Sequence, residues 1–334
     1  MLNTAEGGTV DYELVDQEEQ LQSCLDEIKQ AVSNGKRLAL DCEGESLSRD
    51  GKMQLLTIAT RGKSYILDIQ KLKALPFERG LRALLEDKNV MKLMFDCRGD
   101  ADALFHQFHV KLDGVLDIQL LEIMKRPEFA CKPINRKRSD NTVSAIRLSS
   151  LLGCIEEYVK SDDMVKQKRE GMDLQNNWTQ RPLTTEQMKY AKTDVLSLFR
   201  LFDHFNPDDE EKTRLEIASQ IYVDLKRSIP ARTYNEFENN KYLPVDIIPD
   251  KGSSSFPKGN VSCTECYRQF PGDEFSKKQL KMRKQMCRTC KAVKRDKDVH
   301  QNRLANFERA EREESVDYYE SDEYNVDDDD GDEW

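Results

Sequence analysis

The sequence lacks any stretch of 18 apolar residues that would be long enough to cross a bilayer as a helix. Its first twenty residues, MLNTAEGGTVDYELVDQEEQ, are acidic and lack the basic-then-apolar order of a secretory signal. We therefore expect neither a membrane span nor a cleaved signal, and no membrane partner. Nine cysteines without a secretory signal indicate reduced thiols, so we expect an intracellular location, in the nucleus or the cytoplasm.

An excess of positive charge is also lacking, because the 334 residues carry a formal net charge of −10. This value is dominated by residues 313–334, which contain twelve acidic and no basic side chains. Without those twelve negative charges the remainder of the chain carries about +2. The overall acidity therefore does not exclude nucleic acid as a partner, and local patches have to decide.

Composition and apolar periodicity divide the chain into an α/β domain and a smaller C-terminal part. Strand patterns lie at KRLALDCEG and in a hairpin, MQLLTIAT and SYILDI, around Arg61-Gly62. Helical patterns cover 20–34, 76–87, 148–160 and 184–205. The predicted organisation is a disordered N-terminus at 1–10, an α/β domain at 11–230, a linker at 231–260, a small cysteine-containing module at 261–298, and a charged helix with a disordered acidic tail at 299–334.

Acidic side chains accompany two of these elements, and a further one, Asp100, follows a buried strand in KLMFDCRGDADALF. Asp41 and Glu43 alternate on a strand, so both should face one side while Cys42 faces the core, and a bound cation is the usual remedy for two crowded carboxylates. Tyr190 and Asp194 are four residues apart on a helix and share one face. Each pattern alone also has an ordinary explanation, such as a solvated helix face or, for an acidic residue after a strand, a helix N-cap.

In combination, these residues resemble the DEDDy family of 3′–5′ exonucleases. LALDCEGESL, MQLLTIAT and YILDI are similar to the first three strands of the RNase D and Werner-type exonuclease domain, and NNWTQRPLTTEQMKYAKTDVLSLFRLF is similar to the third RNase D motif. FDCRGDADALFHQFHVKLDGVLDIQLLE resembles the Egalitarian-type subfamily, whose members work in RNA pathways. The resemblance covers about residues 20–210 and implies an RNase H-like α/β fold, a mixed sheet flanked by helices.

The resemblance also implies a metal site. Carried over position by position, Asp41, Glu43, Asp100 and Asp194 would hold two divalent ions, and Tyr190 would orient the attacking water. Two ions ~3.5–4 Å apart activate the nucleophile and stabilise the leaving oxygen, and hard oxygen ligands select Mg²⁺ or Mn²⁺ rather than zinc.

Asp100 has competitors in its own segment. Asp96, Asp102 and Asp117 are acidic and close in sequence, but Asp100 aligns best by its distance from the preceding strand, and Asp117 would support the site from behind. Phe95 stands where RNase D-like sequences often have histidine, a change that removes no ligand. The histidines after Asp100 are interpreted as structural rather than as a general base.

The resulting functional prediction is a metal-dependent 3′–5′ exonuclease that hydrolyses single-stranded RNA or DNA, with RNA favoured by the subfamily resemblance. Some Egalitarian-type proteins have lost metal ligands and bind RNA without cutting it. The alternative is therefore a catalytically silent RNA-binding scaffold or adaptor in an RNA-processing or silencing complex.

Two cysteine pairs in the C-terminal part form a second candidate metal site. Cys263 and Cys266 are followed after twenty residues by Cys287 and Cys290. This C-x₂-C…C-x₂-C spacing is typical of a tetrahedral structural Zn²⁺ site, whereas two disulfides or coincidental free thiols are the alternatives. The module loosely resembles cysteine-rich interaction domains of fungal silencing adaptors, which implies a protein partner.

Two basic segments are candidates for contact with the phosphate backbone. One lies at 126–147 and includes Arg136, Lys137 and Arg138, and the other follows the first cysteine pair and includes Lys281, Lys284 and Arg288. Both segments have a solvated surface as the alternative, and the second has pairing with the acidic tail as a further one. Tyr267, Phe270 and Phe275 are expected to form the small core of the module rather than to stack on bases.

Overall fold

The computed structural model describes residues 11–127, 148–173, 177–228, 236–237, 240–253 and 259–322. Arg136, Lys137 and Arg138, the N-terminal residues 1–10 and the last residues of the acidic tail lie outside the described residues. Within this part of the chain, no helix is both long and apolar enough to cross a membrane.

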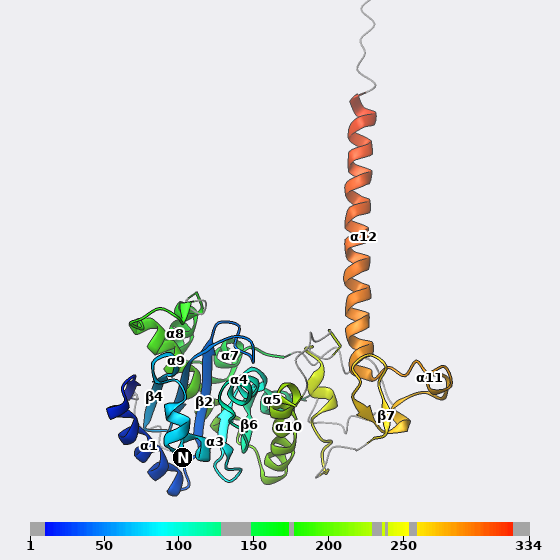
Figure 1. The fold of residues 1–334 in the computed structure, drawn as a ribbon. Helices are drawn as coiled ribbons and strands as arrows, with labels where there is room; N and C mark the ends of the chain where they lie inside the picture. Colours follow the sequence, from blue (N-terminus) through cyan, green and yellow to red (C-terminus); the bar gives the residue numbers. More distant parts are fainter. Residues whose placement is uncertain are drawn as a thin grey trace, which may run out of the picture.

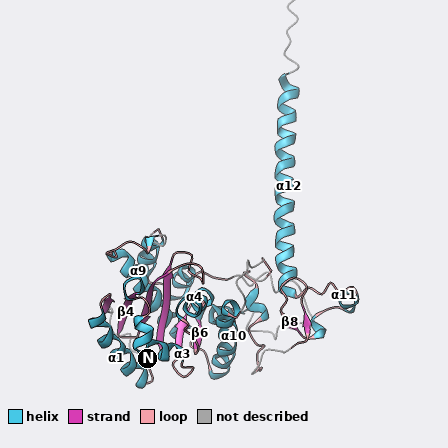
Figure 2. Cartoon of the chain, viewed as in Figure 1, coloured by secondary structure: helices cyan, strands magenta, loops and turns pink. Residues whose placement is uncertain are grey.

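A six-stranded mixed sheet forms the centre of the molecule, as the sequence predicts (Figure 2). Its strand order is β1-β4-β3-β2-β5-β6. β2, β3 and β4 are antiparallel neighbours, whereas β1 pairs with β4, β5 with β2, and β6 with β5 in parallel. The strands are β1 (Asp11–Val15), β2 (Leu38–Gly44), β3 (Met53–Ala59), β4 (Lys63–Asp68), β5 (Lys92–Met94) and β6 (Val115–Asp117).

Helices flank this sheet (Figure 1). α9 lies against β2, β3 and β4, while α10 packs against α4 and β6. The helices are α1 (Glu18–Ser33), α2 (Ile69–Leu72), α3 (Arg82–Glu86), α4 (Arg98–Phe108), α5 (Ile118–Lys125), α7 (Leu151–Cys154), α8 (Asp162–Met172), α9 (Thr185–Phe205), α10 (Asp209–Arg227), α11 (Lys277–Lys281) and α12 (Arg288–Asp322), with π-helical turns η1 (Phe77–Leu81) and η3 (Ile155–Val159) and 3-10 turns η5 (Leu243–Asp246) and η6 (Gly272–Glu274).

The hairpin of β3 and β4 confirms the turn predicted at Arg61-Gly62. Thr60 closes it, because its hydroxyl accepts hydrogen bonds from the amides of Gly62 and Lys63 at 3.4 and 3.2 Å. All seven residues of β3 are buried, so this strand runs through the middle of the core. The expected helix at 76–87 is interrupted instead, because Gly80 adopts φ 122°, outside the helical region.

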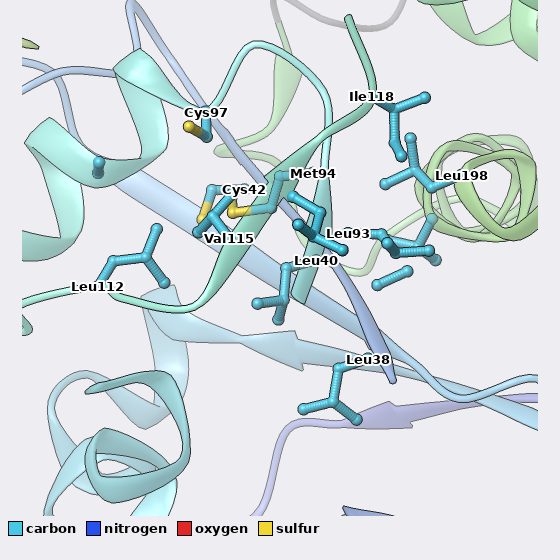
Figure 3. Close-up of a cluster of buried hydrophobic side chains, with 14 of the residues drawn as sticks. Leu38, Leu40, Cys42, Leu93, Met94, Cys97, Leu112, Val115, Ile118 and Leu198 are labelled. Atoms are coloured by element: carbon cyan, nitrogen blue, oxygen red, sulfur yellow. The ribbon is translucent and has the colours of Figure 1, made fainter. Parts of the chain in front are cut away.

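Alternation along β2 separates its two faces. Cys42 is buried beside Leu40, Met94 and Val115 in the core (Figure 3). Asp41 on the opposite face is only half-buried, as is Glu43. The predicted arrangement, with the thiol inward and the two carboxylates together on the other side, is therefore confirmed.

The C-terminal part contains a two-stranded sheet of β7 (Val261–Ser262) and β8 (Gln269–Phe270) beside the four cysteines. α12 leaves this region and projects away from the rest of the described chain (Figure 1). The segment 231–260, which precedes the cysteines, was expected to be a linker. Its described residues 240–253 carry four buried apolar side chains: Tyr242, Leu243, Ile247 and Ile248. These side chains pack onto the main core, and residues 240–253 are called the strap below.

Candidate functional site

The central strand and a long helix bring three predicted carboxylates together. Asp41 and Glu43 extend from β2, and Asp194 extends from α9, with only 3% of its surface exposed. One ligand oxygen from each of the three lies within 4.8 Å of the others. These side chains come from positions about 150 residues apart and meet because α9 lies across β2.

α9 also places Tyr190 at the site. The helix begins at a capping box, in which the hydroxyl of Thr184 accepts from the amide of Gln187 and the Gln187 side chain accepts from the amide of Thr184. Tyr190 lies one turn before Asp194 and is 2% exposed. The Trp178 ring packs against the Tyr190 ring with their centroids 6.0 Å apart, in the same buried cluster.

Asp100 reaches the same strand from the first turn of α4. Its Oδ1 accepts a hydrogen bond of 2.9 Å from the backbone amide of Cys42, between Asp41 and Glu43. This places Asp100 next to the cluster, although it is not part of the group within 4.8 Å.

The other acidic candidates of this segment have different partners. Asp96 pairs with Arg98 at 2.5 Å and Asp102 with Arg49 at 2.8 Å. Asp117 caps α5 and accepts from the amide of Cys97 at 2.9 Å, which holds the start of α4 from behind. Asp100 therefore remains the best candidate among the four.

Crowding and lost hydration disfavour negative charge in the cluster. Burial, together with the charges of Glu43 and Asp194, raises the pKa of Asp41 well above its ordinary value. Burial and Asp194 raise the pKa of Glu43 to about 8, and burial raises that of Asp100 to about 6. Asp194 Oδ1 is buried without a hydrogen-bond donor among the described residues. A divalent cation would relieve both the repulsion and this unsatisfied oxygen.

Sequence reasoning missed Lys168, which lies inside the site. Its Nζ donates to Asp194 Oδ2 at 2.5 Å and to Tyr190 Oη at 2.6 Å, and the side chain is only 9% exposed. Burial disfavours its charged form, but Asp194 and Tyr190 hold the pKa of Lys168 above its ordinary value. The signal that could have found it is the spacing of its helix α8, where Met164, Lys168 and Gly171 fall on one face.

The four C-terminal cysteines also converge. Cys263 Sγ lies 3.7 Å from Cys290 Sγ, and Cys266 Sγ lies 3.9 Å from Cys287 Sγ, which excludes disulfides. Sulfurs around a tetrahedral zinc with bonds of about 2.3 Å are separated by about 3.8 Å. The arrangement fits a zinc ion.

Two predictions for this module are wrong in part. Phe270 and Phe275 form its core, with rings 6.1 Å apart, but Tyr267 is 64% exposed at a positive φ of 59°. Arg288 was expected on a nucleic-acid surface, yet its Nε donates to the buried Asp246 at 3.1 Å and only 10% of its side chain is exposed. Arg268 donates to the same carboxylate, so both arginines connect the module to the strap.

Lys281 and Lys284 are exposed, as their predicted role requires. This exposure is equally expected of a solvated basic surface, so their contact with nucleic acid stays a prediction.

Known proteins are similar to the part of the chain that carries the carboxylate site. A model of the 3′-5′ exonuclease family matches residues 12–208, which is more than half of the chain. The chain is 32% identical to the piRNA biogenesis protein EXD1 of Xenopus laevis over 114 residues, 34% of this chain and 25% of that protein. It is 26% identical to the Egalitarian protein homolog of Caenorhabditis elegans over 169 residues, 49% of this chain and 28% of that protein. The matches thus span about a quarter of the length of these relatives.

Solved structures share the fold. RNase D of Trypanosoma brucei in complex with GMP superposes with a TM-score of 0.56 at 21% identity, covering 78% of this chain and 83% of that one. Its complex with RNA U12 gives 0.53 at 22% identity, covering 81% and 95%. Family match, fold and carboxylate site agree, and the chain belongs to the 3′-5′ exonuclease family.

Proposed function

We propose that the protein is a divalent-metal-dependent exonuclease that hydrolyses single-stranded nucleic acid, preferably RNA, from its 3′ end. The observation that carries this proposal is the convergence of Asp41, Glu43 and Asp194 within 4.8 Å, with an unsatisfied buried oxygen on Asp194. Family membership supplies the reaction class, and the geometry supplies a site at which that reaction can take place.

Asp41, Glu43, Asp194 and Asp100 would hold the ions, and the all-oxygen donor set suits Mg²⁺ or Mn²⁺. Members of this family generally use such ions, and the number of two is part of the proposal. When bound, the ions would supply an activated water and would stabilise charge on the leaving oxygen.

The protein's own groups position the reactants. The Tyr190 hydroxyl, held by Lys168 at 2.6 Å, would orient the attacking water. Asp100 fixes the end of β2 through the Cys42 amide and so sets the spacing of Asp41 and Glu43. Each of these contacts orders a group before substrate arrives, which is how a buried polar site contributes to rate.

RNA is the proposed substrate because several similar proteins have names that connect them with RNA. Two of them, from Xenopus laevis and Mus musculus, are piRNA biogenesis proteins, and one structural neighbour is an RNase D bound to RNA U12. The exposed Lys281 and Lys284, and by sequence Arg136, Lys137 and Arg138, would add contacts to the phosphate backbone.

The four cysteines would hold one structural Zn²⁺, which leaves no open position for catalysis. Backbone amides support this assignment, because those of Cys287 and Cys290 donate to the sulfurs of Cys263 and Cys287 at 3.4 Å. We propose a division into an exonuclease domain at 11–230, a connecting segment, and this zinc module at 261–298, with a nuclear or cytoplasmic location. Tyr267 is exposed on the module and would be available to contact a protein partner.

One contact favours a second candidate function, that of an RNA-binding scaffold without cleavage. Lys168 occupies Asp194 Oδ2, an oxygen that a metal ion would otherwise use. In this alternative the lysine replaces the ion, and the site binds RNA or only stabilises the fold.

A cleavage assay decides between the two. Single-stranded RNA and DNA labelled at the 3′ or 5′ end are incubated with Mg²⁺ or Mn²⁺ and wild-type protein, Asp41→Ala or Asp194→Ala. The matched control is Asp203→Ala, which removes an acid of α9 that is half exposed and paired with Arg61. Shortening from the 3′ end by wild-type protein and the control, but by neither site variant, supports the enzyme. Retained binding without cleavage by wild-type protein supports the scaffold.

A further inference from the structure

Lys168 is the buried basic side chain of the carboxylate site. Only 7% of its surface is exposed, and its ammonium group contacts Asp194 Oδ2, Tyr190 Oη and the face of the Tyr190 ring, 3.9 Å from the ring centre. A lysine is seldom buried unless it is paired, and here both of its oxygen partners belong to the proposed catalytic set.

The packing of α8 on α9 fixes this position. Met164, Lys168 and Gly171 lie at helical spacing on one face of α8, and Gln167 accepts a hydrogen bond of 2.8 Å from Thr193 of α9. A Cβ on Gly171 would lie 2.2 Å from a ring atom of Tyr190, so the missing side chain allows the two helices to approach closely. The close contact between α8 and α9 thus places Lys168 beside Tyr190 and Asp194.

The two oxygens of Asp194 consequently differ. Oδ2 accepts from Lys168, whereas Oδ1 has no donor among the described residues and belongs to the carboxylate whose neighbours are Asp41 and Glu43. The fixed positive charge lies beside the place where a divalent ion would bind. This charge would repel such an ion and would at the same time orient one of its ligands.

We propose that Lys168 is a positioning residue that holds Asp194 and Tyr190 in their working arrangement and, through its fixed charge, limits the affinity of the site for divalent ions. This inference rests on the proposed function. It gives the lysine two separable effects: loss of its charge tightens metal binding, and loss of its hydrogen bonds slows turnover.

A purely structural lysine would behave differently. Its replacement would lower the thermal midpoint and weaken metal binding and turnover together, because a distorted site loses both. Tighter metal binding combined with slower turnover is a signature that structural damage does not produce.

The experiment measures Mn²⁺ binding to the full chain without nucleic acid, by electron paramagnetic resonance of the free ion, together with kcat and KM on labelled RNA. The variants are Lys168→Met, which removes charge and hydrogen bonds, Lys168→Gln, which keeps a donor, and Lys168→Arg, which keeps the charge. Lys166→Met is the control, because Lys166 lies on the same helix with 71% of its side chain exposed. Circular dichroism verifies that each variant is folded.

We expect Lys168→Met and Lys168→Gln to bind Mn²⁺ about tenfold more tightly than wild-type protein, because a positive charge within a few ångströms of the ion is removed. kcat should fall at least about tenfold in Lys168→Met and less in Lys168→Gln, with little change in KM. Lys168→Arg and Lys166→Met should leave the Mn²⁺ affinity as it is.

Unchanged or weaker Mn²⁺ binding in folded Lys168→Met and Lys168→Gln overturns the inference. The proposed function fails in a distinguishable way: wild-type protein then shows no Mn²⁺ binding that Asp41→Asn and Asp194→Asn abolish, and the role of Lys168 fails with it.

Discussion

The two candidate metal sites, the four cysteines and the carboxylate cluster, differ in where their side chains come from and in how deeply these are buried. The four cysteines lie within one short segment, are buried, and have sulfurs 3.7–3.9 Å apart in the two pairs. The carboxylate cluster takes its side chains from β2, α4 and α9. Its two carboxylates from β2 are half-buried, and a lysine contacts the carboxylate from α9. A closed cysteine cluster would stabilise the local fold by holding an ion, whereas the carboxylate cluster brings together mutually repelling groups that the rest of the fold has to hold in place.

The largest expected effect concerns the thiolate cluster. Cys287→Ser should reduce the zinc content, measured by mass spectrometry, from one ion per chain to none. Apparent free energies of zinc binding of about 10–16 kcal/mol in small zinc folds imply that the module then unfolds.

Limited proteolysis should accordingly cut the variant within 261–298 while the metal-dependent cleavage of RNA is retained. Wild-type protein treated with a zinc chelator serves as the parallel control. A zinc-free wild-type protein with an intact module would remove the distinction between the two clusters.

The next effect concerns the connection between the module and the strap. Asp246 is 3% exposed and accepts from Arg268 and Arg288. Asp246→Asn leaves two arginines without their anion, so the stability of the C-terminal part should fall by about 3–5 kcal/mol.

Hydrogen exchange of 259–290 measures this loss, with exchange in β3 as the internal control. Equal protection in the variant and the wild-type protein would mean that the strap and the module are independent.

A smaller effect is expected where α8 meets α9. Gly171→Ala introduces a Cβ into the Tyr190 ring, which should cost about 1–3 kcal/mol and displace Lys168. Chemical denaturation measures the first effect and RNA cleavage the second.

Gly62→Ala is the matched control, because a Cβ there meets nothing within 4 Å. If both substitutions have the same effect, the close helix contact does not position the site.

The smallest expected change has the opposite sign. In metal-free buffer near neutral pH, Asp41→Asn removes a carboxyl group whose ionisation is disfavoured in the folded site by burial, Glu43 and Asp194, so the free energy of unfolding should rise by about 1 kcal/mol. Cleavage should nevertheless fall at least about 100-fold, since loss of a group that only supports a metal site already costs 10–100-fold.

Denaturation with and without Mn²⁺ makes the contrast visible, because the ion should stabilise wild-type protein and not the variant. A less stable metal-free Asp41→Asn would show that this carboxylate contributes to the fold as a cysteine ligand does.

The sequence could predict what depends on local pattern. Alternation put Asp41 and Glu43 on one face of β2, and the C-x₂-C spacing brought the cysteines together. Side-chain pairs between distant elements were out of reach. The alignment favoured Asp100 over Asp102, but the reason for the difference, the pairing of Asp102 with Arg49, involves a distant residue. The spacing of α8 places Lys168 on its buried face, yet nothing local in the sequence shows that its partners are Asp194 and Tyr190. Tyr267 was misplaced because an aromatic residue between two cysteines has no local signal for which side it faces.

Anomalous X-ray diffraction from crystals soaked in Mn²⁺ would show whether the carboxylate cluster binds divalent ions. We expect anomalous peaks bounded by Asp41, Glu43 and Asp194, which disappear in Asp194→Asn crystals. Crystals of wild-type protein that show Lys168 on Asp194 and no manganese at these carboxylates would contradict this expectation.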